Sequence, residues 1–218
     1  MKDWTFNIDI VSKDLFFPKV RVKTKIQVIN ILLEASRYII SNPKLKQNES
    51  KGQIKLVVDK MSRLFFISEK KSFSIAFPFI VNEINGNLDL SFKNNINVNS
   101  YLISQTKSAI NCNSFEDDCV LGFADSLDEL KNEDNDEDLW FFIRELMLYE
   151  DGYIRYDNDP IGHQEAKDKG KPHRHPLDHY DLFYTNGATF KIGLKRAIKT
   201  VQFIDLLNRQ TDCDYLKN

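Results

Sequence analysis

The sequence LDHYDLFYTNGATFKIGL, residues 177–194, is the most informative segment for the fold of this chain of 218 residues. Apolar and polar residues alternate on both sides of Asn186-Gly187. This dipeptide is typical of a tight β-hairpin turn, because both of its residues tolerate positive φ. A two-residue turn there would pair Phe183 with Phe190. One face of the hairpin would then carry His179, Asp181, Phe183, Phe190, Ile192 and Leu194, with Lys191 on the opposite face.

A second alternating run, YIRYDND at 153–159, comes shortly before this hairpin. We expect it to pair with the strand at 177–185, so that it forms an antiparallel β-meander with the hairpin. The residues between these strands, 160–176, are expected to form a loop. Arg155 and Asp157 would then lie on one face of the meander, next to the strand that carries histidine.

The rest of the chain predicts helices and further strands. Apolar residues recur at helical spacing in three segments, 24–41, 137–149 and 200–209. Extended patterns occupy 73–81, 88–92 and 98–110, and the segment 53–66 fits either structure. The predicted fold class is therefore α+β, with an antiparallel sheet that ends in the C-terminal β-meander and with helices packed on it.

The chain is expected to form a single α+β domain, residues 1–218, in three consecutive parts. Residues 1–110 form a basic half with a helix and strands, and residues 111–138 form an acidic loop. Residues 139–218 contain a helix, the β-meander with the histidines and a C-terminal helix. The chain shows neither an internal repeat nor a long linker, so one domain is the simplest organisation.

Charge is distributed unevenly along the chain. Residues 1–75 carry fifteen Lys or Arg and seven Asp or Glu, whereas residues 116–138 carry eleven Asp or Glu and one Lys. Solvated surfaces explain both segments. Alternatively, the basic half faces a nucleic-acid backbone, and the acidic segment shields it or docks a protein partner. The sequence leaves both interpretations open.

Composition narrows the class of protein. The chain has no apolar run of about 18 residues, so no membrane span or membrane partner is expected. Its first residues lack the pattern of a secretory signal. Three cysteines without CxxC spacing indicate free thiols in a reducing compartment rather than a zinc site. We therefore expect a cytoplasmic protein.

All four histidines fall within seventeen positions, at His163, His173, His175 and His179. Histidine titrates near neutral pH and often binds metals, so this concentration indicates a site. On an extended strand, residues four positions apart are separated by about 13 Å. His175 and His179 therefore cannot share a metal ion unless His175 begins a helical turn. We predict neither metal ligands nor a cofactor, and we place His163 and His173 in the solvated loop.

The C-terminal third resembles a known family at four segments, YIRYDNDP, HRHPLDHYDLFY, FKIGL and VQFIDLL. The family comprises uncharacterised bacterial proteins with a YDxDP strand, an HPxxH strand and a terminal helix. The pattern is also similar, more distantly, to TumE-type toxins of toxin–antitoxin pairs. The resemblance covers about residues 150–208 and implies a defence or toxin context. Position by position, it implies roles for Tyr156, Asp157, Asp159, His175, Pro176 and His179, and the long loop at 160–172 departs from the pattern.

Two functions from different classes follow as hypotheses. In the first, the protein acts on nucleic acid, with RNA favoured, and cleaves a phosphodiester. His179 or His175 acts as the base, Asp181 or Asp157 orients it, and Arg155 binds a phosphate. In the second, the protein is a non-enzymatic subunit of a defence or toxin–antitoxin complex. Its histidine strand is then structural, and residues 116–138 dock the partner.

Overall fold

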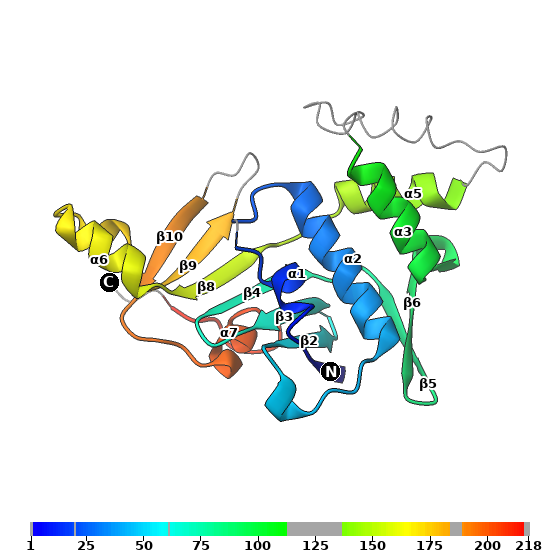
Figure 1. Ribbon diagram of the computed structural model, residues 1–218, viewed down its shortest axis with the longest axis horizontal. Coiled ribbons are helices and arrows are strands. Elements are labelled where there is room, and N and C mark those ends of the chain that lie inside the picture. Colours follow the sequence, from blue (N-terminus) through cyan, green and yellow to red (C-terminus); the bar gives the residue numbers. More distant parts are fainter. Residues whose placement is uncertain (1, 20, 61, 113–136, 184–188, 216–218) are drawn as a thin grey trace. The chain divides into compact units, whose positions relative to one another are not determined.

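The chain folds into two compact units, each assembled from segments that are distant in sequence (Figure 1). The computed structural model describes residues 2–19, 21–60, 62–112, 137–183 and 189–215. The first unit comprises Met1–Lys23, Lys44–Phe77 and Asp151–Asn218, and the second comprises Thr24–Pro43 and Pro78–Glu150. Strands and helices occur in both, so the α+β fold class is confirmed. That the chain forms a single domain stays a prediction.

The first unit is built on an antiparallel sheet of seven strands among the described residues, in the order β1-β2-β3-β4-β8-β9-β10 (Figure 1). The strands are β1 (Lys2–Asn7), β2 (Gln53–Val58), β3 (Arg63–Ile67), β4 (Lys71–Ala76), β8 (Ile154–Asn158), β9 (Asp178–Phe183) and β10 (Thr189–Leu194). The predicted meander is therefore confirmed as β8, β9 and β10. Its neighbour β4 comes from a much earlier part of the chain.

Both faces of this sheet bury aromatic side chains. On one face the rings of Phe66 and Phe73 stack with centroids 4.4 Å apart, next to Phe16 of α1 (Lys13–Phe16). On the other face, Phe203 of α7 (Thr200–Leu206) packs edge-on against Phe65. Burial of such large apolar side chains is the main favourable contribution to the stability of a sheet packed with helices.

Among its described residues, the second unit combines three helices with a three-stranded sheet in the order β5-β6-β7. The elements are α2 (Lys25–Ser41), β5 (Ile80–Ile84), β6 (Asn87–Phe92), β7 (Ile96–Asn97), α3 (Ser100–Ile110) and α5 (Glu137–Leu148). Three buried phenylalanines, Phe79, Phe92 and Phe142, pack together in its core. The predicted helices at 24–41 and 137–149 are confirmed, and residues 113–136 of the predicted acidic loop lie outside the described residues.

Three expectations about single elements are wrong. The predicted strand at 98–110 is helix α3, because Asn99 caps it and its buried residues recur at helical spacing. The predicted strand at 73–81 ends at Ala76, and β5 begins a separate sheet. Part of the predicted loop at 160–176 is helix α6 (Pro160–Asp168), followed by the short turn η4 (Pro172–Arg174).

The register of the β9–β10 hairpin also differs from the prediction by one residue. Phe190 pairs with Leu182, and Lys191 pairs with Asp181. A shift of one residue moves every side chain of a strand to the opposite face. Lys191 therefore shares a face with Asp181, and Ile192 packs with the apolar cluster on the other side of the sheet. The predicted turn at Asn186-Gly187 lies outside the described residues.

Among the helices that the structure describes, none combines the length and apolar character needed to cross a membrane.

Candidate functional site

A cluster of charged side chains occupies one face of the sheet where β4, β8, β9 and β10 lie side by side. Direct pairing of strands places these side chains on the same face, because antiparallel partners point to the same side. Lys71 pairs with Asp157, and Asp157 pairs with His179. Asp181 pairs with Arg155 on β8 and with Lys191 on β10. The members of this charged cluster are Lys71, Arg155, Asp157, His179, Asp181 and Lys191.

Asp181 is the centre of the charged cluster and is completely buried. Its Oδ2 accepts a hydrogen bond from Arg155 Nη2 at 2.5 Å, and its Oδ1 accepts one from Lys191 Nζ at 2.8 Å. Burial alone would raise the pKa of Asp181. The hydrogen bond from Lys191 and the charge of Arg155 outweigh burial and hold that pKa below its ordinary value. Asp181 is thus a permanent carboxylate at neutral pH.

Arg155 joins both carboxylates of the charged cluster. Its Nη2 lies 2.7 Å from Asp157 Oδ2 in addition to its contact with Asp181. Its guanidinium also lies over the ring of Phe183, with 5.4 Å between Cζ and the ring centroid. The residue is only 8% exposed. Arg155 therefore orients the carboxylates, and most of its surface is enclosed by protein.

His179 is completely buried and is oriented from both sides of its ring. Its Nδ1 donates a hydrogen bond to the Pro176 carbonyl at 2.8 Å, and its Nε2 accepts one from Lys191 Nζ at 2.6 Å. Burial and then the charge of Lys191 lower the pKa of His179. The ring is therefore neutral at neutral pH. Gly193 leaves room for Pro176, since a Cβ at position 193 would lie 2.7 Å from Pro176 Cγ.

His175 belongs to a second, more accessible pair next to His179. Its Nε2 donates a hydrogen bond to Asp159 Oδ2 at 2.9 Å, and its ring lies edge-on to that of His179 with centroids 5.0 Å apart. Burial would raise the pKa of Asp159, but the Gly162 N–H and His175 lower it below the ordinary value. The His175 side chain is 26% exposed. An imidazole held by a carboxylate in this way keeps its other nitrogen available as a base.

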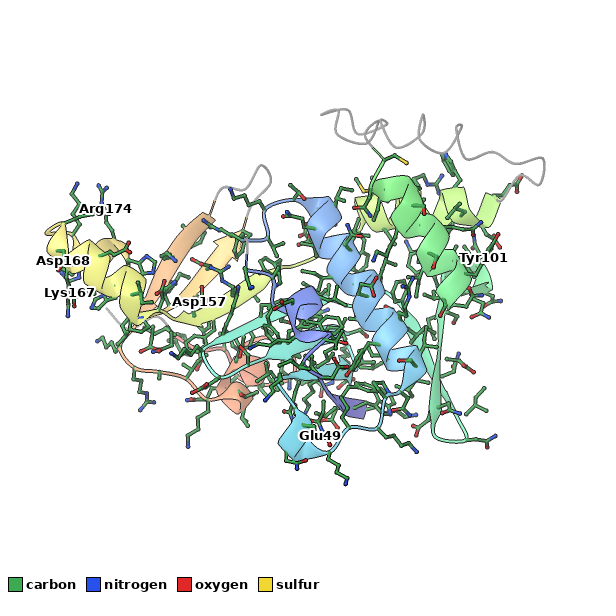
Figure 2. The ribbon with its side chains drawn as sticks, viewed as in Figure 1. Glu49, Tyr101, Asp157, Lys167, Asp168 and Arg174 are labelled. Atoms are coloured by element: carbon green, nitrogen blue, oxygen red, sulfur yellow. The ribbon has the colours of Figure 1, made fainter. Side chains whose placement is uncertain are left out.

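Helix α6 positions this second pair. Asp159 caps the helix through a hydrogen bond from the Gly162 N–H at 2.9 Å, and Pro160 occupies the first helical position. His163, on the first turn, donates from Nδ1 to the His175 carbonyl at 2.7 Å. The expectation that His163 lies in a loop is wrong, whereas His173 lies in η4 and is exposed. Figure 2 shows Lys167, Asp168 and Arg174 pointing outward at the far end of α6 and η4.

The structure brings all five predicted site residues together. Arg155, Asp157, His179 and Asp181 share the charged cluster, and His175 lies against its edge (Figure 2, where Asp157 is labelled). Their catalytic roles stay predictions.

Two lysines were not among the predicted site residues. Lys191 was assigned to the opposite face because the hairpin register was wrong by one residue. Lys71 precedes the segment that was predicted as a strand, 73–81, although β4 begins at Lys71. The alternation of KSFSIA from Lys71 would have included it in the strand. Only the pairing of β4 with β8, however, brings it to Asp157.

Three side chains of the charged cluster have the geometry of metal ligands. One ligand atom each from Asp157, His179 and Asp181 lies within 4.8 Å of the others. The ammonium of Lys191 occupies the space beside two of these atoms, at 2.6 Å from His179 Nε2 and 2.8 Å from Asp181 Oδ1. A divalent cation would therefore have to displace Lys191 and lie next to the guanidinium of Arg155, which electrostatic repulsion opposes.

Comparison with known proteins found no family model, no curated protein and no solved structure that matches this chain.

Proposed function

We propose that this protein is a bacterial defence or toxin-type ribonuclease that cleaves RNA through the histidines at the charged cluster. The observation that supports this proposal is the pair of adjacent imidazoles with different surroundings. His175 is accessible and bound to Asp159, whereas His179 is buried and neutral beside Lys191. The defence context is an expectation from the family resemblance alone.

His175 is the better candidate for the general base. Its Nε2–H is donated to Asp159, which leaves the lone pair of Nδ1 for a proton. His179 is completely buried, and its Nε2 already accepts a hydrogen bond from Lys191. In the proposed reaction, His175 takes the proton of a ribose 2′-hydroxyl and the 2′-oxygen attacks the adjacent phosphorus. The bond between phosphorus and the 5′-oxygen breaks, and this oxygen takes up a proton from water, giving a 2′,3′-cyclic phosphate and a 5′-hydroxyl end. Nearby cations stabilise the charge on the phosphate oxygens.

The predicted test compares an RNA oligonucleotide with a DNA oligonucleotide of the same sequence, each with chelator and with added Mn²⁺. Only the RNA has the 2′-hydroxyl, so we expect cleavage of RNA alone, with chelator present. The substitution His175→Ala is expected to lower the cleavage rate by about 10²–10⁴-fold, the usual contribution of a general base. The exposed His173, two positions away, provides the matched control, and His173→Ala is expected to cleave at the wild-type rate.

Cleavage of both oligonucleotides only with Mn²⁺ would contradict this mechanism and favour a metal bound by Asp157, His179 and Asp181. Absence of cleavage under all conditions would contradict the proposed function itself.

A second function, as a non-enzymatic subunit of a defence or toxin–antitoxin complex, is favoured by the complete burial of His179 and Asp181. Buried, fully paired polar groups often specify a fold rather than perform chemistry. This alternative predicts that His179→Ala lowers the melting temperature while wild-type protein leaves RNA intact. The acidic stretch 116–138 would dock the partner, and most of it lies outside the described residues.

A further inference from the structure

Lys71 is the one cation of the charged cluster that forms no ion pair with Asp157 or Asp181 among the described residues. Its side chain lies on the same sheet face as Asp157 and is partly buried. Among the residues that the structure describes, no carboxylate lies within ion-pair distance of its ammonium. Both carboxylates of the charged cluster instead bind Arg155, and Asp181 also binds Lys191.

The charges of the charged cluster leave an excess of one positive charge. Three cations, Lys71, Arg155 and Lys191, face two carboxylates, and His179 is neutral because burial and Lys191 lower its pKa. Burial and the nearby charge of Arg155 also lower the pKa of Lys71, although the two carboxylates act in the opposite direction. Partial burial of an unpaired ammonium costs free energy, and an anion bound beside it removes that cost.

Arg155 offers a second unused donor. Its Nη2 makes both ion pairs, while its Nε is enclosed and has no hydrogen-bond partner among the described residues. Buried donors in native proteins nearly always have a partner. The enclosed Nε cannot itself meet an anion from solvent, but it leaves the guanidinium incompletely satisfied. The unpaired ammonium of Lys71 on the neighbouring strand indicates that an anion binds at this end of the charged cluster.

We infer that Lys71, together with Arg155 and Lys191, binds a phosphodiester group of a single-stranded nucleic acid. The choice of nucleic acid as the source of the phosphate rests on the proposed function. The excess of positive charge is independent of that proposal. Phosphate oxygens accept several charge-assisted hydrogen bonds at once, from ammonium as well as guanidinium donors. Lys191 is the more exposed of the two paired cations, with 25% of its side chain accessible. Lys71 lies opposite Asp157 on the neighbouring strand, and the charges of Arg155 and Asp181 also act on it.

The test uses a fluorescent oligo-deoxythymidylate, whose binding is followed by anisotropy at several salt concentrations. This DNA lacks the 2′-hydroxyl, so binding is measured without cleavage. Each phosphate contact to a single strand contributes about 0.7 to the slope of log affinity against log salt. We expect Lys71→Gln to lower that slope by about 0.7 and to weaken binding about tenfold at low salt. Lys71→Arg retains the charge and is expected to retain the slope.

The exposed Lys51, in the loop before β2, provides the matched control. Lys51→Gln is expected to bind with the wild-type slope, and the melting temperature of Lys71→Gln without anion is expected to be no lower than that of the wild type, because the variant removes an unpaired ammonium. An unchanged slope for Lys71→Gln overturns the inference, as does wild-type protein that binds inorganic phosphate but not the oligonucleotide. If RNA is not cleaved but Lys71→Gln lowers the slope, the proposed function fails and the inference stands. If RNA is cleaved and the slope is unchanged, only the inference fails.

Discussion

At the scale of single residues, the surroundings of His179 decide its chemistry. Complete burial disfavours the imidazolium, and the ammonium of Lys191 at Nε2 disfavours it further. The hydrogen bond from Nδ1 to Pro176 and the nearby carboxylates favour it but are outweighed. His179 is therefore a neutral acceptor that fixes Lys191. This role suits a positioning residue better than a base exposed to substrate.

Because the pKa of His179 is lowered, we predict that the free energy of unfolding decreases as the solution becomes acidic. In the unfolded chain His179 binds a proton near pH 6.5, whereas the folded protein resists that protonation. The free energy of unfolding contributed by this group is therefore fully present above pH 6.5 and is lost as the pH falls below it. The loss proceeds by at most about 1.4 kcal/mol per pH unit.

Urea denaturation between pH 8 and pH 5 measures this loss. The variant His179→Gln is expected to be less stable at pH 8 and to lose less stability toward pH 5. His173→Gln changes an exposed histidine and is expected to follow the wild-type curve. If the free energy of unfolding of His179→Gln depends on pH as steeply as that of the wild type, another group is responsible for the loss.

At the scale of elements, helix α6 positions the pair of His175 and Asp159 through close contact at one glycine. A Cβ atom at Gly162 would lie 2.6 Å from Asp159 Oδ2 and 2.6 Å from His175 Nε2. Real Cβ atoms do not approach polar atoms so closely, so the two side chains would have to separate. Gly162 is thus required by tertiary contact, although it lies inside a helix, where glycine is unfavourable.

The substitution Gly162→Ala is predicted to lower the free energy of unfolding, although helix propensity alone would raise it. In an ordinary helix interior, replacing glycine with alanine stabilises by about 0.5–1 kcal/mol. Here we expect a loss of about 1 kcal/mol or more, because the cap formed by Asp159 and its hydrogen bond with His175 are both disturbed. Chemical denaturation measures the change, and Ala166→Gly in the same helix shows how strongly α6 responds to propensity alone. A gain in stability for Gly162→Ala would contradict the close contact.

At the scale of the whole molecule, the sheet of the first unit is assembled from distant parts of the chain. Strand β4 pairs with β8, and Phe73 lies opposite Arg155, 82 positions later in the chain. The two compact units each interrupt the other along the sequence. The charged cluster therefore depends on a pairing between chain segments that the sequence assigned to different parts, because Lys71 lies in the N-terminal half and Asp157 in the C-terminal third.

A fragment of residues 139–218, the expected C-terminal part, is predicted not to fold alone. It retains β8, β9 and β10 but lacks β4, so that one edge of β8 loses its hydrogen-bond partner. It also lacks Phe65, against which Phe203 of α7 packs. Circular dichroism is expected to show no cooperative thermal transition for the fragment and a cooperative one for the full chain. A cooperative transition in the fragment would show that the meander is stable without β4.

Sequence alone was enough to predict the α+β class, the β-meander, the helices at 24–41 and 137–149, and five polar residues that the structure brings close together. These features follow from alternation, helical spacing and turn residues, which act over a few neighbouring positions. Contacts between distant segments set the hairpin register, the pairing of β4 with β8 and the inclusion of Lys71 and Lys191. In the predicted register Lys191 would enter an apolar cluster and Asp181 would face Ile192. The observed register is favoured because it pairs the buried charges and buries the apolar side chains together, and such energies depend on partners distant in the chain.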